Sequence, residues 1–367
     1  MSWETQSAFW KGRRVFLTGH TGFKGSWLAH WLLMLGAEVR GFSLAPESGQ
    51  VPDGFKPLFE ELDLGARLDH LTGDVRDEET LKRSLRAFNP EVVLHLAAQP
   101  LVRASYQNPV ETYATNVMGT AHLLNACRSV ADLRSIVVVS SDKCYENREQ
   151  LWAYREIDPM GGHDPYSSSK GCAELVTSAF RDSYFPTERA DEHGVSISSA
   201  RAGNVIGGGD WSEDRLIPDA MRSMLAGSPL EIRNPRAVRP WQHVLEPLQG
   251  YLKLAYKGAE DPALFSKGWN FGPVDGDALP VGDLADRLAA KMHGKFSWKT
   301  AAESGPHEAQ LLALDSTAAR ALLDWKPALS LQGMMDFTAS WYSCRSLEQR
   351  VEMVSGQITQ YTRRLKL

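Results

Sequence analysis

The sequence predicts an α/β fold in which a doubly wound parallel sheet carries a smaller C-terminal substrate-binding domain. Apolar, β-branched runs alternate with helical patterns from about residue 14 to residue 201, the order expected of strands joined by crossover helices. A glycine-rich turn joins the first run to the first helix. After residue 201 the composition changes to a glycine-rich and then arginine-rich stretch, which indicates a chain leaving the sheet to form one wall of a cleft.

Length and composition fit a protein of one large or two closely joined domains. The chain has 367 residues, of which 43% are hydrophobic and 23% are charged. We expect a cofactor-binding domain over residues 1–201 with a returning segment at about 236–272. We expect a substrate-binding domain from about residues 202–235 and 273–367.

The charge balance and the cysteines exclude several classes of partner. A net charge of −5 argues against a nucleic-acid binder. The four cysteines have neither paired nor metal-like spacing, so we expect a reducing compartment and no metal site. No apolar run approaches about 18 residues, and no signal-peptide pattern is visible. The expectation is a cytoplasmic protein that binds a small molecule and no membrane.

The first strand, residues 14–18, and the first helix, residues 25–33, enclose the glycine-rich turn. Glycines at this spacing permit a tight turn and close approach of a pyrophosphate, which the helix N-terminus then binds through its amides. A purely structural turn is the alternative. The residues expected to hold a dinucleotide here are Gly19, Thr21, Gly22, Phe23, Lys24 and Gly25.

The second and third strands are expected to flank the adenosine. Residues 38–44 lack the acid that usually binds the ribose diol, and Arg40 and Ser43 stand near that place, so a 2′-phosphate stays open. Asp74, followed by Val75, ends the third strand. It is expected either to accept a hydrogen bond from the adenine amino group or to cap the helix beginning at Asp77.

The fourth strand, residues 91–99, ends in small residues. Leu96, Ala97 and Ala98 leave room for a flat cofactor over the strand ends. We interpret His95 as a core residue and not as a catalyst. Asn116 opens a long helical pattern to about residue 130, and its side chain is expected to brace the site.

A candidate acid/base set follows the fifth strand, residues 134–139. Ser140, Ser141, Asp142 and Lys143 come next, and Tyr166 and Lys170 stand at i, i+4 on a predicted helix. A nearby cation favours the phenolate of a tyrosine, whose ordinary pKa is about 10, and a hydroxyl can relay the proton. A chance pair on an amphipathic helix is the alternative.

Four of the arginines that follow the sixth strand, residues 195–201, stand out as a candidate cluster within 25 residues. They are Arg215, Arg233, Arg236 and Arg239. Because the guanidinium fork matches phosphate oxygens, the cluster predicts a diphosphate clamp. For any single one of them, solvated surface charge is the alternative.

These stretches together resemble the NAD-dependent epimerase/dehydratase family of the extended short-chain dehydrogenase/reductase superfamily, over nearly the whole chain. The resemblance is greatest to its CDP-sugar 4,6-dehydratases, on residues 18–28, 140–145 and 239–244. It implies a Rossmann fold, NAD, CDP-glucose as substrate, and CDP-4-keto-6-deoxyglucose and water as products, in deoxysugar and lipopolysaccharide biosynthesis. It also implies a homodimer or tetramer built partly on the helices after Thr112 and Tyr166.

The resemblance implies roles for the remaining candidates. Tyr166 takes the 4-hydroxyl proton, Ser141 binds the same oxygen, and Asp142 protonates the leaving 6-hydroxyl. Lys143 stands where related dTDP-sugar enzymes carry a glutamate base, and it serves as a base only if its pKa is depressed. Ser140, Tyr166 and Lys170 also contact the cofactor. The candidate substrate-binding residues are Gln99, Arg103, Ser141, Asn204, Arg215, Leu216, Ile232, Arg233, Arg239, Asn270 and His307.

Three rival interpretations stay open. A nucleotide-sugar 4-epimerase or decarboxylase would share everything except the Asp142–Lys143 pair. A dehydratase acting on a dTDP- or GDP-sugar would share the chemistry and differ in the base. A non-catalytic, cofactor-sensing regulator would be expected to have lost Tyr166 or Lys170, and both are present.

Overall fold

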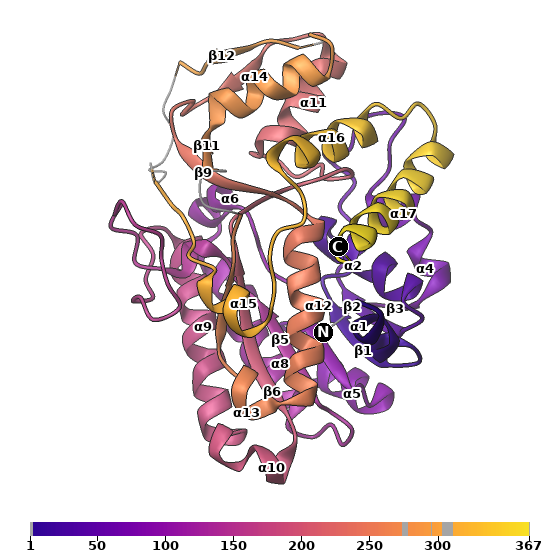
Figure 1. Ribbon diagram of the computed structural model, residues 1–367, viewed down its shortest axis with the longest axis vertical. Helices are drawn as coiled ribbons and strands as arrows, with labels where there is room; N and C mark the ends of the chain where they lie inside the picture. Colours follow the sequence, from indigo (N-terminus) through magenta and orange to yellow (C-terminus); the bar gives the residue numbers. More distant parts are fainter. Residues whose placement is uncertain (1–2, 274–277, 295, 303–310, 367) are drawn as a thin grey trace.

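A seven-stranded sheet forms the centre of the computed structural model, which describes residues 3–273, 278–294, 296–302 and 311–366. All its neighbouring strands are parallel, in the order β10-β6-β5-β4-β1-β2-β3 (Figure 1). The strands are β1 (Arg14–Thr18), β2 (Glu38–Ser43), β3 (Asp69–Thr72), β4 (Val92–His95), β5 (Ser135–Val139), β6 (Ser196–Ala202) and β10 (Gly268–Phe271). The predicted doubly wound parallel sheet is confirmed.

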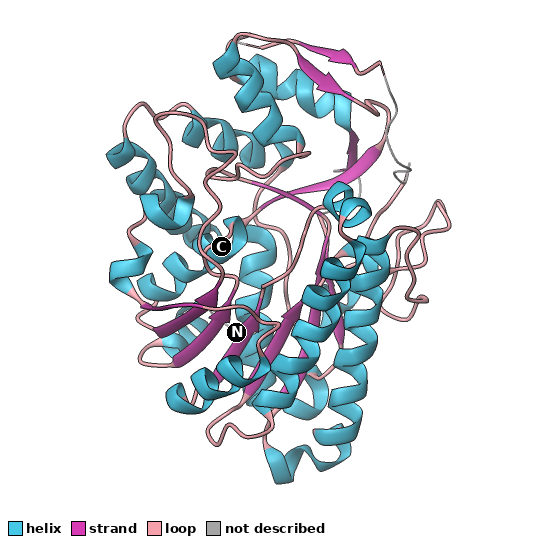
Figure 2. Cartoon of the chain, turned by 180° about the vertical axis from the view of Figure 1, so that it is seen from behind, coloured by secondary structure: helices cyan, strands magenta, loops and turns pink. Residues whose placement is uncertain are grey.

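Alternate side chains of the strands face two separate cores, which is why the strands read as continuous apolar runs. Val15 and Leu17 of β1 pack into one core with Trp27 of α2, whereas Phe16 packs into the other with Leu85 of α5. The sheet therefore lies between two helical layers, as Figure 2 shows from behind. The first layer contains α1 (Trp3–Trp10), α2 (Phe23–Met34) and α12 (Leu245–Glu260), and the second contains α5 (Glu78–Phe88), α8 (Gly119–Cys127) and α9 (Pro165–Tyr184).

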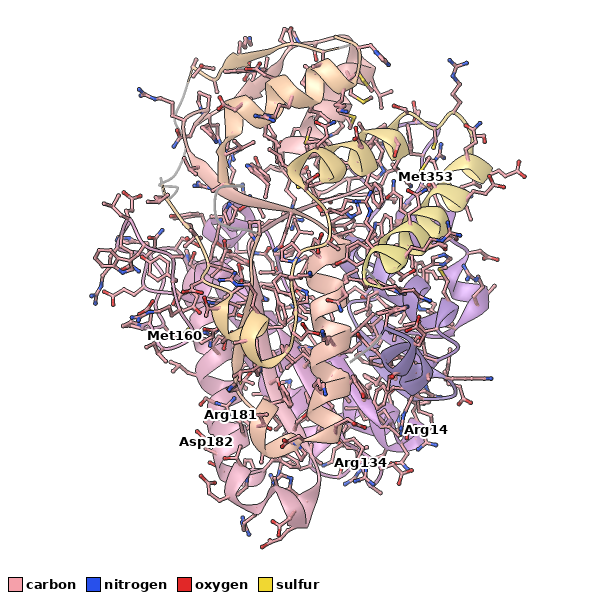
Figure 3. The ribbon with its side chains drawn as sticks, in the orientation of Figure 1. Arg14, Arg134, Met160, Arg181, Asp182 and Met353 are labelled. Atoms are coloured by element: carbon pink, nitrogen blue, oxygen red, sulfur yellow. The ribbon has the colours of Figure 1, made fainter. Side chains whose placement is uncertain are left out.

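The amino ends and the carboxyl ends of the strands carry different kinds of side chain. At the amino ends of the strands, Arg14 Nη2 donates to Asp132 at 2.7 Å and Arg14 Nε donates to the carbonyl of Asn89 at 2.9 Å. Figure 3 labels Arg14 and Arg134 at this edge, far from the second domain. The candidate site residues come instead from the carboxyl ends, where parallel α/β sheets bind their ligands.

A smaller set of elements lies above those carboxyl ends (Figure 1). It contains two small sheets, β11-β9-β7 and β12-β8, and helices α11, α14 and α16. Their bounds are β7 (Asn204–Ile206), β8 (Leu230–Ile232), β9 (Val238–His243), β11 (Ala278–Pro280), β12 (Trp298–Thr300), α11 (Leu216–Ala226), α14 (Val281–Lys291) and α16 (Leu331–Tyr342). Two C-terminal helices return to the larger sheet: α15 (Thr317–Leu322) contacts β10, and α17 (Leu347–Arg364) contacts α2.

Short helices complete the described chain. They are α3 (Leu58–Glu61), α4 (Leu64–Arg67), α6 (Val102–Gln107), α7 (Pro109–Tyr113), the π-helix η1 (Ala114–Met118), the 3₁₀-helices η2 (Asp142–Cys144) and η3 (Thr187–Arg189), α10 (Ala190–His193) and α13 (Pro262–Phe265). Within the described ranges, no helix combines the length and the apolar character needed to cross a bilayer.

Candidate active site

The glycine-rich turn is shaped by two positions that admit only glycine. Gly19 has a φ of +73°, and a Cβ there would lie 2.7 Å from the amide nitrogen of Ala97. A Cβ at Gly25 would lie 2.0 Å from the carbonyl oxygen of Gly19. Helix α2 begins at Phe23, two residues earlier than predicted, so its first amides face the turn. This turn against β4 fits a bound dinucleotide pyrophosphate.

The side chain of Arg40, on β2, is held by neighbouring protein groups. Its guanidinium hydrogen-bonds to Asp69 of β3 at 2.6 Å, donates to the carbonyl of Ser84 and lies over the Phe88 ring. Ser43, at the strand end, instead shares a 2.8 Å hydrogen bond with the hydroxyl of Thr21. The Arg40 guanidinium is therefore engaged by residues of β3 and α5, and its charge is not directed at a 2′-phosphate.

The capping role considered for Asp74 is wrong. Asp77 caps α5 itself, because its carboxylate accepts from the amide of Thr80 at 3.1 Å. The Asp74 carboxylate is bound by Arg76, whose hydrogen bond lowers the pKa of Asp74. Val75, beside it, is buried against Gly119. A contact of Asp74 with adenine stays a prediction.

Asn116 braces the end of β4. Its Oδ1 accepts from the amide of Gln99 at 2.8 Å, and its Nδ2 donates to Ser169 of α9 at 2.8 Å. Asn116 lies in the π-helix η1, a distortion that often marks functional sites. The His95 ring is buried between Thr18 and Thr120, as expected of a core residue, and burial lowers its pKa to about 3.

The carboxyl end of β5 presents Ser141 and Asp142 at the start of η2. Ser141 Oγ donates to Asp142 Oδ1 at 3.0 Å and accepts from the amide of Lys143 at 3.2 Å. Among the described residues, none hydrogen-bonds to the buried Asp142 Oδ2. A Cβ at Gly203 would lie 3.1 Å from that oxygen and 2.7 Å from Pro240 Cγ, so Gly203 packs closely beside the carboxylate. Burial raises the pKa of Asp142, which favours a protonated carboxyl.

Helix α9 brings Tyr166 and Lys170 to this group. It starts with Pro165 after Asp164, whose carboxylate accepts from the Ser167 amide as an N-cap. Burial raises the pKa of Tyr166 to about 12, and the hydrogen bond with Ser141 opposes that rise. Burial lowers the pKa of Lys170 to about 8. Phenolate formation therefore needs nearby positive charge.

Two further lysines lie near the catalytic group. Lys143 Nζ is 5.9 Å from the centroid of the Tyr166 ring. Burial, together with Arg215 and Lys170, lowers the pKa of Lys24 to about 7, while Asp142 opposes that change. Lys24, predicted as a cofactor ligand, thus also belongs electrostatically to the catalytic group.

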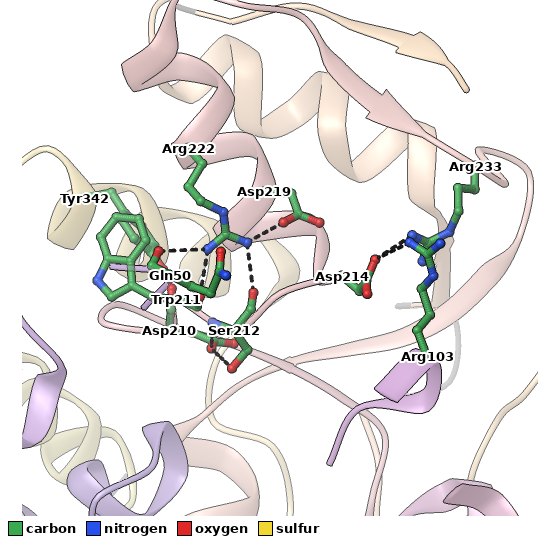
Figure 4. Close-up of polar contacts among 10 residues, drawn as sticks. All are labelled: Gln50, Arg103, Asp210, Trp211, Ser212, Asp214, Asp219, Arg222, Arg233 and Tyr342. Atoms are coloured by element: carbon green, nitrogen blue, oxygen red, sulfur yellow. Dashed lines mark hydrogen bonds and ion pairs between the residues drawn. The ribbon is translucent and has the colours of Figure 1, made fainter. Parts of the chain in front are cut away.

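The predicted arginine cluster divides into separate contacts. Asp214, in the left-handed region at φ +57°, accepts from Arg103 Nη1 and Arg233 Nη1 at 2.9 Å each (Figure 4). Arg215 pairs with Asp210 at 3.3 Å. Arg239 is buried and lowers the pKa of Asp142. Arg236 is exposed, which agrees with the alternative that a single arginine of the cluster is a solvated surface charge.

Asp210 and its loop are held by Arg222 of α11. Arg222 Nη1 donates to the carbonyl of Trp211 at 2.7 Å, and its Nη2 donates to the carbonyl of Ser212 at 3.0 Å (Figure 4). Tyr342 donates its hydroxyl proton to the Asp210 carbonyl at 2.7 Å. The loop that carries Asp214 and Arg215 is therefore fixed from two sides.

The other candidate substrate-binding residues differ in whether their side chains are already hydrogen-bonded inside the protein. Asn204 begins β7 opposite Trp241, Leu216 begins α11, and Ile232 is buried at the end of β8. The Asn270 side chain is engaged inside the protein, since Oδ1 accepts from Tyr145 and Nδ2 donates to the carbonyls of Tyr154 and Asp315. Gln99 likewise bonds to Leu101 and Thr112. These bonds argue against direct substrate contacts by Asn270 and Gln99. His307 lies outside the described residues.

Sequence reasoning missed a buried ion pair next to the site. Glu174 Oε1 accepts from Arg201 Nε at 2.9 Å, and Glu174 Oε2 accepts from Arg201 Nη2 at 2.8 Å. One signal was available: Glu174 follows Lys170 by four residues on the same helix, as Lys170 follows Tyr166.

Comparison with known proteins agrees with this arrangement. The model of the family described as GDP-mannose 4,6 dehydratase matches residues 16–338. CDP-glucose 4,6-dehydratase of Salmonella typhimurium is 51% identical over 334 residues, which cover 91% of this chain and 91% of that enzyme.

Solved structures share the fold. MoeE5 in complex with UDP-glucuronic acid and NAD has a TM-score of 0.72 and 26% identity, covering 89% of this chain and 98% of that one. The dTDP-glucose 4,6-dehydratase of Bacillus anthracis in complex with NAD has a TM-score of 0.72 and 20% identity, covering 90% and 96%. The glycine turn, the serine–tyrosine–lysine group and the family match together show that this chain belongs to the GDP-mannose 4,6-dehydratase family of nucleotide-sugar dehydratases.

Proposed function

We propose that the protein converts CDP-glucose to CDP-4-keto-6-deoxyglucose and water, with NAD as a cofactor that is regenerated in place. The observation that carries this proposal is the buried Asp142 carboxyl beside Ser141, whose Oδ2 accepts no hydrogen bond from the described residues. The 51% identity to a CDP-glucose 4,6-dehydratase supports the choice of substrate. The glycine turn and the NAD complex of the 26% identical relative support the cofactor.

The residues of the chain divide the proton transfers between them. Bound NAD would take hydride from C4 of the sugar and return it to C6. The Tyr166 phenolate removes the 4-hydroxyl proton, and Ser141, hydrogen-bonded to Tyr166, orients that oxygen. The resulting 4-ketone acidifies the C5 proton. Asp142, whose burial favours the protonated form, gives its proton to the leaving 6-hydroxyl, and Lys143 is the proposed base at C5.

The proposed substrate is tested with a panel of nucleotide glucoses. Formation of a 4-keto-6-deoxy sugar is followed by its alkaline absorbance with CDP-, dTDP-, UDP- and GDP-glucose. We expect CDP-glucose to give the highest kcat/KM. A higher value for another nucleotide would replace the substrate and keep the chemistry, whereas inversion at C4 without water loss would identify a 4-epimerase.

We predict that NAD binds more tightly than NADP. The cation that the sequence places near the ribose, Arg40, is held by Asp69 and the Ser84 carbonyl, so its charge is already engaged away from a 2′-phosphate. NAD affinity should be moderate, because the second strand supplies no carboxylate for the ribose diol. Titration of the apoprotein with both cofactors measures this, and Arg40→Ala should leave the order of affinities unchanged. Tighter NADP binding would refute the prediction.

We predict that Arg239→Ala weakens substrate binding more than it slows turnover. Arg239 is buried at the start of β9, near Asp142, where a guanidinium can bind the diphosphate. Steady-state kinetics should show KM raised by a larger factor than kcat is lowered. The matched control is Arg236→Ala, which removes an exposed arginine three residues away and should change neither constant. A fall in kcat with unchanged KM would contradict the clamp.

The oligomeric state and the location in the cell complete the proposal. We infer a homodimer formed on α7, η1 and α9, with pairing of dimers into a tetramer as the alternative, and a cytoplasmic location. In support of the dimer, Val110, Tyr113, Met118 and Leu175 of these helices are large apolar side chains left exposed in one chain. A nucleotide sugar is a small-molecule partner, in keeping with the net charge of −5.

A further inference from the structure

Three side chains of α9 follow one another at intervals of one helical turn. Tyr166, Lys170 and Glu174 stand at i, i+4 and i+8, so they share a face of the helix with about 5–6 Å between successive Cβ atoms. All three are buried, with 7%, 6% and 5% of their surface exposed. The first two belong to the proposed mechanism, and Glu174 has no part in it.

Glu174 is held as an ionised carboxylate. Arg201 of β6 binds both its oxygens, and Ser199 Oγ donates to Oε2 at 2.5 Å. Arg201 is fixed in turn, since its Nη1 donates to the Tyr145 hydroxyl at 2.7 Å and Gly268 packs against its guanidinium. These contacts lower the pKa of Glu174 despite its burial. Its negative charge is therefore permanent at neutral pH.

Apart from Tyr166, whose phenolate Lys170 supports, the other described ionisable groups that act on Lys170 carry no negative charge. His95 of β4 is neutral, because burial lowers its pKa to about 3. Cys144 of η2 is a neutral thiol, because burial raises its pKa well above the ordinary value. Lys24 of α2 brings a like charge when it is protonated. Among the groups of the described chain that act on Lys170, Glu174 is the one carboxylate, and it opposes the effect of burial.

We infer that Glu174 is a positioning residue, the counter-charge that keeps the Lys170 amine protonated while that amine supports the Tyr166 phenolate. This inference rests on the proposed function, because it gives Lys170 its cationic role. The competing explanation is that Glu174 serves only to neutralise Arg201 inside the fold. The two explanations differ in what happens to the titration of Lys170 when the charge of Glu174 is removed.

Glu174→Gln removes the charge and keeps an oxygen acceptor for Arg201 and Ser199. Lys170 is an ammonium below its pKa and loses the proton as pH rises through about 8, so activity falls on that alkaline side. Without the anion this alkaline limb of the kcat/KM profile should move to lower pH by about one unit or more, since a neighbouring opposite charge typically shifts a pKa by about 1–3 units. Glu174→Asp keeps the negative charge, so it should return the alkaline limb most of the way to its wild-type position. A purely structural role would lower activity by the same factor at every pH.

A double variant guards against misfolding caused by a stranded arginine. Glu174→Gln with Arg201→Gln removes both charges of the buried pair, which is better tolerated than removing one. If Glu174 acts on Lys170, the limb still moves to lower pH. If Glu174 only neutralises Arg201, the limb of the folded double variant stays within a few tenths of a unit of wild type, and the inference is overturned.

A readout independent of turnover separates this inference from the proposed function. In protein carrying ¹³C-lysine, the Cε resonance of Lys170 is assigned by its loss in Lys170→Met and titrated by NMR. Its midpoint should fall in the double variant relative to wild type, even if CDP-glucose proves not to be the substrate. An unchanged midpoint would overturn the role of Glu174 and leave the proposed substrate untouched.

Discussion

Tyr166→Phe should lower kcat by at least about 10²-fold, the loss typical of removing a general acid/base, while NAD binding stays at the wild-type level. Tyr166 is buried and hydrogen-bonded to Ser141, with Lys143 Nζ 5.9 Å from its ring. Phenylalanine fills the same space and deletes only the oxygen that accepts the 4-hydroxyl proton. Turnover with CDP-glucose and cofactor titration, measured on the same preparation, separate chemistry from binding.

A matched control lies on the neighbouring helix. The hydroxyl of Tyr113 donates to Ser168 of α9 at 3.1 Å, so Tyr113→Phe also removes a tyrosine hydroxyl that contacts this helix. It should leave kcat nearly unchanged, because that hydroxyl takes no part in proton transfer. If Tyr166→Phe kept more than about a tenth of the wild-type rate, a loss far below the usual one, Tyr166 would not be the base.

The parts of the fold that follow from local pattern were predictable. Strands buried on both faces read as apolar runs, and steric contacts exclude a Cβ at Gly19 and at Gly25, the two ends of the turn. The seventh strand, β10, lies within the segment predicted to return to the sheet. Helix α2 begins two residues earlier than expected, which agrees with the general uncertainty of helix ends.

The partners of long side chains were not predictable, because they depend on tertiary contacts. Asp69, which holds Arg40, is 29 residues away in sequence, and Tyr145, which binds Asn270, is 125 residues away. Asp77, and not Asp74, caps α5 because its carboxylate lies within reach of the Thr80 amide. The bonds of Asn270 therefore argue against its predicted substrate contact. Ser141, Asp142, Lys143, Tyr166 and Lys170 remain the proposed catalytic set.

Asp142→Asn should oxidise C4 and stop before water leaves. Asp142 is buried, and burial raises the pKa of its carboxyl, so the acid form persists to higher pH than for an exposed aspartate and is lost as pH rises through that pKa. Asparagine keeps the shape and cannot deliver a proton. Under single-turnover conditions the absorbance of reduced nicotinamide should rise and persist, with 4-keto-glucose held by the enzyme. Wild type should show only a transient signal.

Asp164→Asn is the control for the loss of negative charge alone. Asp164 caps α9 and influences the pKa of Tyr166, yet asparagine caps a helix equally well, so this variant should still complete dehydration.

In deuterated water the wild-type product should carry solvent deuterium at C5, because that proton is removed and replaced, whereas the hydride from C4 should reach C6 undiluted. A product without deuterium at C5 would exclude dehydration by this route. Full turnover by Asp142→Asn would show that another group protonates the leaving hydroxyl, and Lys143, the next residue along η2, would then be the first candidate.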